Sequence, residues 1–302
     1  MAVQPIFKGA TGLVNAVEAH RLRYFENGFC QLAEAVNVII DDAGSVKRRF
    51  GISSLFEGPV HSLWSKGKYC FFISAGDLYR RTMEGTNVLV TSAVGDYPAF
   101  FALFQDKCYM ANGSVKLIID DSSVTAWTAN IPTQLKGDSR VLGMLSGFTR
   151  LCTHSGRMFV LVDGNRLWQS EPGNARCFDL AAGSIPFSGV TGIISVGTGL
   201  YVSHAGGVEF IAGSSKDDFE PRSVYTKPII PGTLSVIDGS DVDSGIEYFG
   251  KLAIWVSSDG VCLGDSRGVV HNKTSRSLVF DKAISGAAAV MPGYYFFSLE
   301  VE

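Results

Sequence analysis

The sequence has little charge, no long apolar run and no basic leader. Charged residues make up 18% of its 302 residues, below the roughly 25% that is usual for soluble domains. No stretch approaches the roughly 18 consecutive apolar residues of a membrane span, and residues 1–7 lack the basic and apolar regions of a secretory signal. These absences argue against an exported or membrane-spanning chain, so we expect no membrane partner.

The six cysteines show no C-x-x-C pair, and most lie inside apolar, strand-like segments. This distribution predicts reduced thiols in a core and gives no reason to expect a metal or a cofactor. The formal net charge is −3, which provides no general attraction for polyanions. Any nucleic acid would therefore be contacted locally or passively.

One pattern recurs along the chain: a strand-like apolar segment, a tight glycine turn and a second strand. Its copies occupy residues 68–79, 107–117, 157–168, 200–210 and 251–263. The turns contain Asn-Gly, Asp-Gly or Gly-Gly, which adopt positive φ at low cost and join antiparallel strands. With 34 Gly and 20 Phe in the chain, the pattern favours an all-β protein.

Additional strand-like segments at 88–91, 123–127, 193–196 and 277–280 raise each unit to about four strands. We therefore predict a single all-β domain, a β-propeller of about six four-stranded blades. A β-sandwich or two stacked barrels would produce a similar pattern.

The two ends of the sequence predict how such a ring closes. Residues 36–56 contain an early copy of the hairpin, and residues 284–302 contain only two strands. We expect an extended arm over 1–35, a closing hairpin over 36–56, the middle blades over 57–283 and the inner strands of the last blade over 284–302. The early hairpin would then complete the C-terminal blade and leave no free sheet edge.

The sequence contains no recognisable catalytic constellation. Its five histidines each stand alone, without a nucleophile elbow or a zinc signature. His204 is expected on an inner strand that faces the channel, and Asp259 lies in a segment that only approximates a sialidase box. The acidic loop 238–247 does not have EF-hand spacing. We predict that the protein is not an enzyme and that it has no catalytic, cofactor or metal residues.

Lys47, Arg48 and Arg49 form the main basic concentration, with Arg21 and Arg23 upstream. They are candidates for contacts between subunits, because clustered cations can pair with carboxylates of a neighbour. The alternative is a solvated outer strand, on which short charge runs are common.

Four segments, of which the first is 12–16, resemble propeller tail proteins of tailed bacteriophages, above all the tail nozzle, or tail tubular B type, of short-tailed phages. The segment 28–51 carries Asn37, Gly44 and Gly51, and the segment 166–178 carries Trp168, Ser170 and Gly173. The segment 255–270 resembles a late blade of the same proteins.

The resemblance implies a structural virion protein that assembles in the host bacterial cytoplasm. The expected assembly is a homo-oligomeric ring, with a hexamer favoured, beside the adaptor, the portal and other tail proteins. Double-stranded DNA would pass through this ring during ejection without specific binding. Two alternatives stay open: a non-enzymatic binding propeller for a host glycan or protein, and a hydrolase without a known motif that uses His204 or Asp259.

Overall fold

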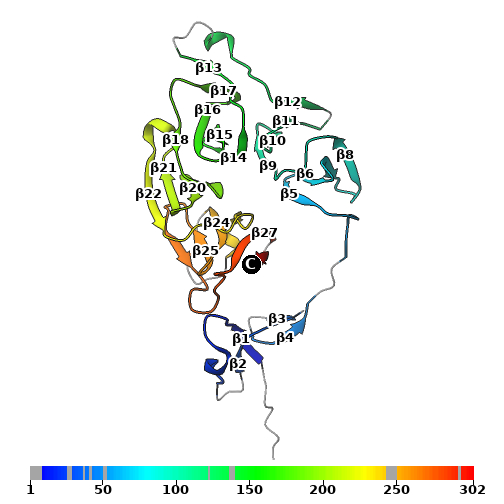
Figure 1. The fold of residues 1–302 in the computed structure, drawn as a ribbon, viewed down its shortest axis with the longest axis vertical. Helices are drawn as coiled ribbons and strands as arrows, with labels where there is room; N and C mark the ends of the chain where they lie inside the picture. The colour runs from blue at the N-terminus through cyan, green and yellow to red at the C-terminus, as the bar shows by residue number, and fades with distance from the viewer. Residues whose placement is uncertain are drawn as a thin grey trace, which may run out of the picture.

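The computed structural model describes residues 9–25, 29–36, 38–40, 43–49, 53–121, 123–135, 140–242, 250–291 and 294–302. The protein is all-β, and its strands form a β-propeller with five blades. Figure 1 shows these sheets in chain order around a ring that is open on one side. In the described residues no helix is long and apolar enough to cross a membrane.

Each blade is an antiparallel sheet of consecutive strands. The first is built from β5 (His61–Lys66), β6 (Tyr69–Ser74), β7 (Asp77–Arg81) and β8 (Asn87–Thr91). The second is built from β9 (Phe100–Phe104), β10 (Lys107–Ala111), β11 (Lys116–Ile119) and β12 (Val124–Ala126).

The third blade has four longer strands with two short additions. It contains β14 (Phe148–His154), β15 (Arg157–Val162), β16 (Arg166–Glu171) and β17 (Asn174–Asp179), with β13 (Leu142–Gly143) and β18 (Ile185–Pro186). The fourth contains β19 (Gly192–Val196), β20 (Gly199–His204), β21 (Gly207–Ala212) and β22 (Glu220–Tyr225). The fifth contains β23 (Ser235–Asp238), β24 (Lys251–Ser257), β25 (Gly260–Gly264) and β26 (Val270–Asn272).

All five predicted hairpins are confirmed, and each forms the two middle strands of a blade. The turns adopt the positive φ that the glycines predicted; for example, Ala75 and Gly76 have φ of 51° and 76°. The strands expected at 88–91, 123–127 and 193–196 are also present. The strand expected at 277–280 is wrong: this segment is irregular, and β26 ends earlier, at Asn272.

Apolar side chains fill the space between successive blades, which keeps the flat sheets face to face. Phe71 and Phe101 stack between the first and second blades, with ring centroids 5.7 Å apart. Trp127 is fully buried between the second and third, where its indole Nε1 donates to Ala175 O at 2.9 Å. Tyr201 and Trp255 pack between the fourth and fifth.

After the fifth blade the chain forms a sheet of two strands, β27 (Ala283–Met291) and β28 (Tyr294–Val301). Contacts between neighbouring blades run through their first strands, β5, β9, β14, β19 and β23, and β27 continues this series. That residues 284–302 supply the inner strands of a further blade stays a prediction. The described residues form five complete blades, and the expected sixth is not confirmed.

The N-terminal part of the chain lies outside the ring (Figure 1). Its strands are β1 (Gly9–Leu13), β2 (Phe29–Leu32), β3 (Val38–Ile40) and β4 (Val46–Arg48). β1 pairs with β2 in parallel, and β3 and β4 form the predicted early hairpin.

Short 3₁₀ helices occur along the described chain. They are η1 (Ala19–Arg21), η2 (Thr133–Leu135), η3 (Lys216–Asp218) and η4 (Gly239–Asp241).

The predicted closure of the ring is not formed among the described residues. The hairpin β3–β4 and the hairpin β27–β28 are separate two-stranded sheets that do not pair with each other. The early hairpin instead lies with β1, because Ala10 N donates to Gly44 O at 2.8 Å. The first blade and the C-terminal hairpin therefore face an opening.

Candidate assembly surface at the open side of the ring

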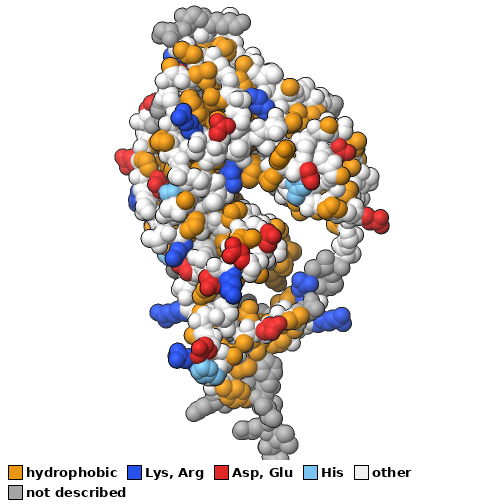
Figure 2. Space-filling model, viewed as in Figure 1, with side chains coloured by type: hydrophobic (Ala, Val, Ile, Leu, Met, Phe, Trp, Pro, Cys, Tyr) orange, Lys and Arg blue, Asp and Glu red, His pale blue; other side chains and the backbone are white. Residues whose placement is uncertain are grey.

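The opening lies between the first blade and the hairpin β27–β28. Figure 2 shows the gap in the space-filling view, with hydrophobic side chains on both of its sides. In a closed propeller each blade has a neighbour on both faces, whereas here, among the described residues, one face of each flanking element has no neighbouring blade. The side chains on these two faces decide what the opening can bind.

The first blade presents an apolar face to the side away from the second blade. Trp64 stacks on Phe101 of the second blade at 5.5 Å, so the adjacent Leu63 points to the opposite face, where it is 67% exposed. Tyr79 pairs in register with Phe72 and with Leu89, which places all three on that same face. Leu89 is half exposed.

Part of this face is covered by the segment that leads into the first blade. The ring of Phe56 contacts Phe72 at 4.9 Å and Tyr79 at 5.4 Å, and Phe72 is almost fully buried. Leu55, beside Phe56, remains 63% exposed. The face is therefore capped near its middle and open at Leu63 and Leu89.

The C-terminal hairpin has one covered and one open face. Val290 and Tyr295, which pair in register, pack on the apolar cluster of the fifth blade. On the other face, the cross-strand partners Met291 and Tyr294 are half exposed, and so is Phe296. The rings of Tyr294 and Phe296 stack at 5.7 Å. Monomeric proteins rarely leave contiguous apolar surface of this kind uncovered.

A close backbone contact fixes the hairpin against the fifth blade. Gly232 has φ of +87°, and a Cβ atom at this position would lie 1.9 Å from Gly286 O on β27. Gly286 N donates to Pro231 O at 2.9 Å. Because only glycine permits this approach, the position of β27 depends on Gly232.

The predicted subunit contacts lie in the N-terminal arm, on or beside β4. Lys47, Arg48 and Arg49 are all exposed. Gly44, in the turn before β4, is buried with φ of +77°, and a Cβ there would lie 2.5 Å from Phe29. The structure thus gives Gly44 a packing role, and it displays the basic cluster on the arm and away from the blades. Asn37 and Gly51 lie outside the described residues.

The other residues of the family-like motif lie in the third blade. Ser170 is buried at a bulge of β16, where its Oγ accepts from Met158 N at 2.9 Å and donates to Glu171 O at 3.0 Å. Gly173 forms the next turn, and its carbonyl accepts from Gln105 of the second blade at 2.9 Å. Trp168 packs against the cluster between these blades. All three hold the fold together.

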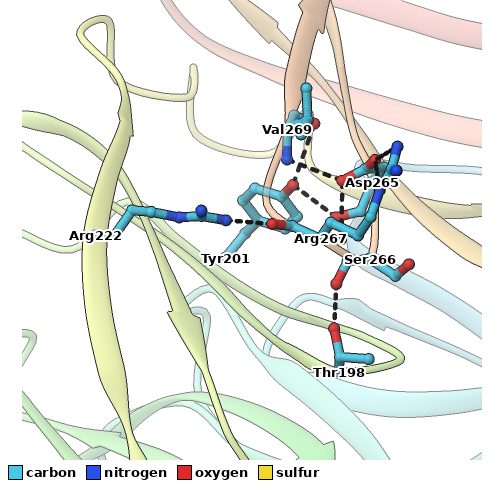
Figure 3. Close-up of polar contacts among 7 residues, drawn as sticks. All are labelled: Thr198, Tyr201, Arg222, Asp265, Ser266, Arg267 and Val269. Atoms are coloured by element: carbon cyan, nitrogen blue, oxygen red, sulfur yellow. Dashed lines mark hydrogen bonds and ion pairs between the residues drawn. The ribbon is translucent and has the colours of Figure 1, made fainter.

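A polar cluster joins the fourth blade to the turn after β25 (Figure 3). Tyr201 OH donates to Asp265 O at 2.8 Å, and the side chains of Arg222 and Thr198 donate to the carbonyls of Arg267 and Ser266. The Asp265 carboxylate accepts from the amides of Arg267 and Val269 at 2.8 Å and from the Arg267 guanidinium.

The same contacts set the ionisation of Asp265. Burial disfavours its charged form, but hydrogen bonds from Val269 and Arg267 outweigh the burial and hold its pKa below the ordinary value. The Asp265 carboxylate binds the amides of its own turn, and the side chains of the fourth blade bind the carbonyls of that turn. The cluster therefore anchors the fourth blade to the fifth.

Two histidines have partners that the sequence did not predict. His154, buried at the end of β14, lies 2.9 Å from Ser195 Oγ through Nδ1 and 2.7 Å from Gly213 O through Nε2. The carbonyl requires a proton on Nε2, and in the neutral ring Nδ1 then accepts from Ser195 Oγ. This contact joins the third and fourth blades. His204 lies at the end of β20, a second strand and not an inner one, and its Nε2 is 3.3 Å from Glu209.

The remaining sequence candidates also have structural partners. Asp259 accepts from Tyr225 OH at 2.9 Å and from Ser257 Oγ at 2.7 Å, which ties a turn of the fifth blade to β22 of the fourth. In the acidic loop, Asp238 accepts from Ser240 N, and residues 243–247 lie outside the described part. Within the described ranges, no three His, Cys, Asp or Glu side chains form a group that could hold a metal ion.

Sequence reasoning missed the open faces, although a signal was present. Residues 294–297 are four successive aromatic residues, Tyr-Tyr-Phe-Phe. Successive strand residues point to opposite faces, so this run predicts a strand that needs apolar cover on both sides. In the structure the fifth blade covers one face of this strand, the face that carries Tyr295.

No protein-family model and no curated protein sequence matches the chain. Among solved structures it is similar to a catalytically inactive virginiamycin B lyase from Staphylococcus aureus, determined with quinupristin, at 12% identity over 92% of this chain and 90% of that one, with a TM-score of 0.49. It is also similar to YCF48 from Cyanidioschyzon merolae, at 13% identity over 79% and 78% of the two chains, with a TM-score of 0.46. The propeller assignment itself follows from the sheets described above.

Proposed function

We propose that this chain is a structural subunit of a bacteriophage tail, and that its subunits associate through the open side of the propeller. The observation that carries the proposal is the pair of apolar faces at the opening, one around Leu63 and Leu89 and one around Tyr294 and Phe296. Burial of apolar surface is the main driving force of association. A chain that leaves these faces uncovered gains stability from a neighbour.

The tail assignment is supported by the sequence resemblance, and the charge of the chain is compatible with it. A ring through which DNA passes functions best when it does not hold its cargo, because each phosphate contact strengthens binding and slows release. The formal net charge of −3 fits passive passage. In this proposal a homo-hexameric ring stands beside the adaptor and the portal.

Association is tested directly by light scattering and negative-stain electron microscopy over a wide concentration range. The expected result is an oligomer, and a particle that stays monomeric at the highest soluble concentration would overturn the proposal. Leu63→Asp and Phe296→Asp should each weaken association, because each buries a charge at the interface. Met83→Asp is the matched control, since Met83 is 85% exposed in a turn of the first blade.

The phage assignment has its own test. Mass spectrometry of purified particles of a phage that encodes this chain should find it among the virion proteins. Its absence from the particles would overturn the tail assignment and leave the assembly of the protein to be explained otherwise.

A further inference from the structure

The C-terminal hairpin ends in a strand that is paired on one side. Among the described residues, β28 forms its ladder with β27 alone, from Met291↔Tyr294 to Ala283↔Val301. An edge of this length presents backbone N–H and C=O groups that readily pair with another strand. The complete blades have two further strands at this position.

Among the described residues of the arm, the strands β3 and β4 pair with each other in a sheet of two strands. β3 and β4 pair through Val38↔Arg48, Ile39↔Lys47 and Ile40↔Val46, and form a sheet of two strands. An isolated two-stranded hairpin is marginally stable at best in water. The two-stranded sheet β27–β28 and the two-stranded hairpin β3–β4 therefore complement each other, because together they supply the four strands of a blade.

The hairpin of the same chain is held away from this edge. Asn15 Nδ2 donates to Val279 O at 3.0 Å and Val279 N donates to Asn15 Oδ1 at 2.7 Å, which anchors the arm beside the irregular segment before β27. The turn of β3–β4 is attached to β1 through Gly44. Figure 1 shows β3 and β4 beside β1 in the arm, below the ring and separated from β27. The hairpin of a second copy is tethered to its own body and not to this one, so it approaches the edge of β28 from outside.

Charge favours the same partner. The last residues of β28 are Glu300 and Val301, and Glu302 follows. All three are exposed, so this end of the strand is acidic. Arg48 on β4 is exposed and lies within the basic cluster. Opposite charges on neighbouring strands stabilise their pairing and select the partner.

We infer that the β3–β4 hairpin of one copy of this chain adds to the outer edge of β28 in a second copy and completes the sixth blade there. This inference rests on the proposed function, because it requires that subunits associate. The exchange supplies two strands, covers the edge and brings Arg48 to the acidic end of β28. Repeated from subunit to subunit, it closes a ring, and in a reciprocal pair it gives a dimer.

The experiment uses variants of the 302-residue chain in a charge-reversal design. Arg48→Glu and the double variant Glu300→Arg with Glu302→Arg should each weaken association about tenfold, measured by analytical ultracentrifugation. Mixing the two variants should restore association, because each then meets its complement in the other chain. Glu220→Arg is the matched control, an exposed strand glutamate on the outer strand of the fourth blade, and it should have no effect. Circular dichroism verifies that every variant is folded.

Amide hydrogen exchange over 294–301 provides the second readout. If the hairpin of one copy pairs with β28 of another, these amides should be protected from hydrogen exchange, and the protection should rise with protein concentration. Protection that is independent of concentration would mean that the hairpin closes the blade of its own chain, and would overturn the inference. Oligomers that persist in all variants, with 294–301 unprotected, would also overturn it and leave the proposed assembly intact. A monomeric wild type would overturn both.

Discussion

Asn15 and Val279 are 264 residues apart in the sequence and are joined by two hydrogen bonds, one in each direction. The Asn15 side chain thus imitates a strand partner for the backbone of Val279. Asn15 N also donates to Ser277 O at 2.7 Å. This contact is where the arm is anchored to the body of the protein, and it occupies the segment for which the sequence predicted a strand.

Asn15→Ala should loosen the attachment of the arm without unfolding the blades, and the hydrogen bonds from the Asn15 and Ala16 amides to Ser277 O should remain. The substitution removes two hydrogen bonds, each worth about 0.5–1.5 kcal/mol, at an exposed site. We expect the amide of Val279 to exchange at least tenfold faster and the melting temperature to change little. Asn165→Ala, at an exposed turn of the third blade, is the control. Unchanged exchange at Val279 would contradict the anchoring role of Asn15.

Asp265→Asn should destabilise the protein near neutral pH and have less effect in acid. The pKa of Asp265 is lowered in the folded state, so its charged form contributes stability above the unfolded pKa of about 3.9, and this contribution is lost as the pH falls through the folded pKa. Loss of the charged acceptor should cost about 1–3 kcal/mol at pH 7. Denaturant titrations at pH 7 and under acid conditions measure the difference, with the exposed Asp281→Asn as control. An equal cost at both pH values would contradict the argument.

The blades could be predicted from the sequence because their signals are local. A turn such as Asp163-Gly164 determines its own φ values and joins strands that are adjacent in the chain. The polar partners of His154 and Asp265 could not be predicted, since each contact joins different blades or an irregular turn and has no fixed spacing. Closure is the hardest case: the pairing of residues 36–49 with 284–301 depends on the whole ring, and the structure leaves the two hairpins apart.

Gly232→Ala should undock the C-terminal hairpin. The new methyl group would lie against Gly286 O, and the positive φ adds strain. Gly67→Ala is a close control, because Gly67 also has a positive φ, of +59°, but nothing lies within 4 Å of its Cβ position. The cost at Gly67 should be about 1–2 kcal/mol, which is the cost of the left-handed conformation.

The two glycine variants separate strain from collision. Gly232→Ala should be less stable than Gly67→Ala in denaturant titrations, and it should expose Val290 and Tyr295, which shows as faster hydrogen exchange across β27. Equal stabilities with an unchanged exchange pattern would show that the close approach at Gly286 is not needed to hold the hairpin.

Thiol labelling tests the predicted cysteine environments. Cys108, Cys152, Cys177 and Cys262 are buried and free, and Cys30 and Cys70 are partly exposed. Burial raises the pKa of Cys108 to about 12 and raises that of Cys152 further, so at pH 8 neither supplies the reactive thiolate. Burial also raises the pKa of Cys70. Brief labelling of the native protein, read by mass spectrometry, should therefore modify Cys30 first and Cys70 more slowly. All six should react in denaturant, and early labelling of Cys108 or Cys152 in the native protein would show that the spaces between the blades open to solvent.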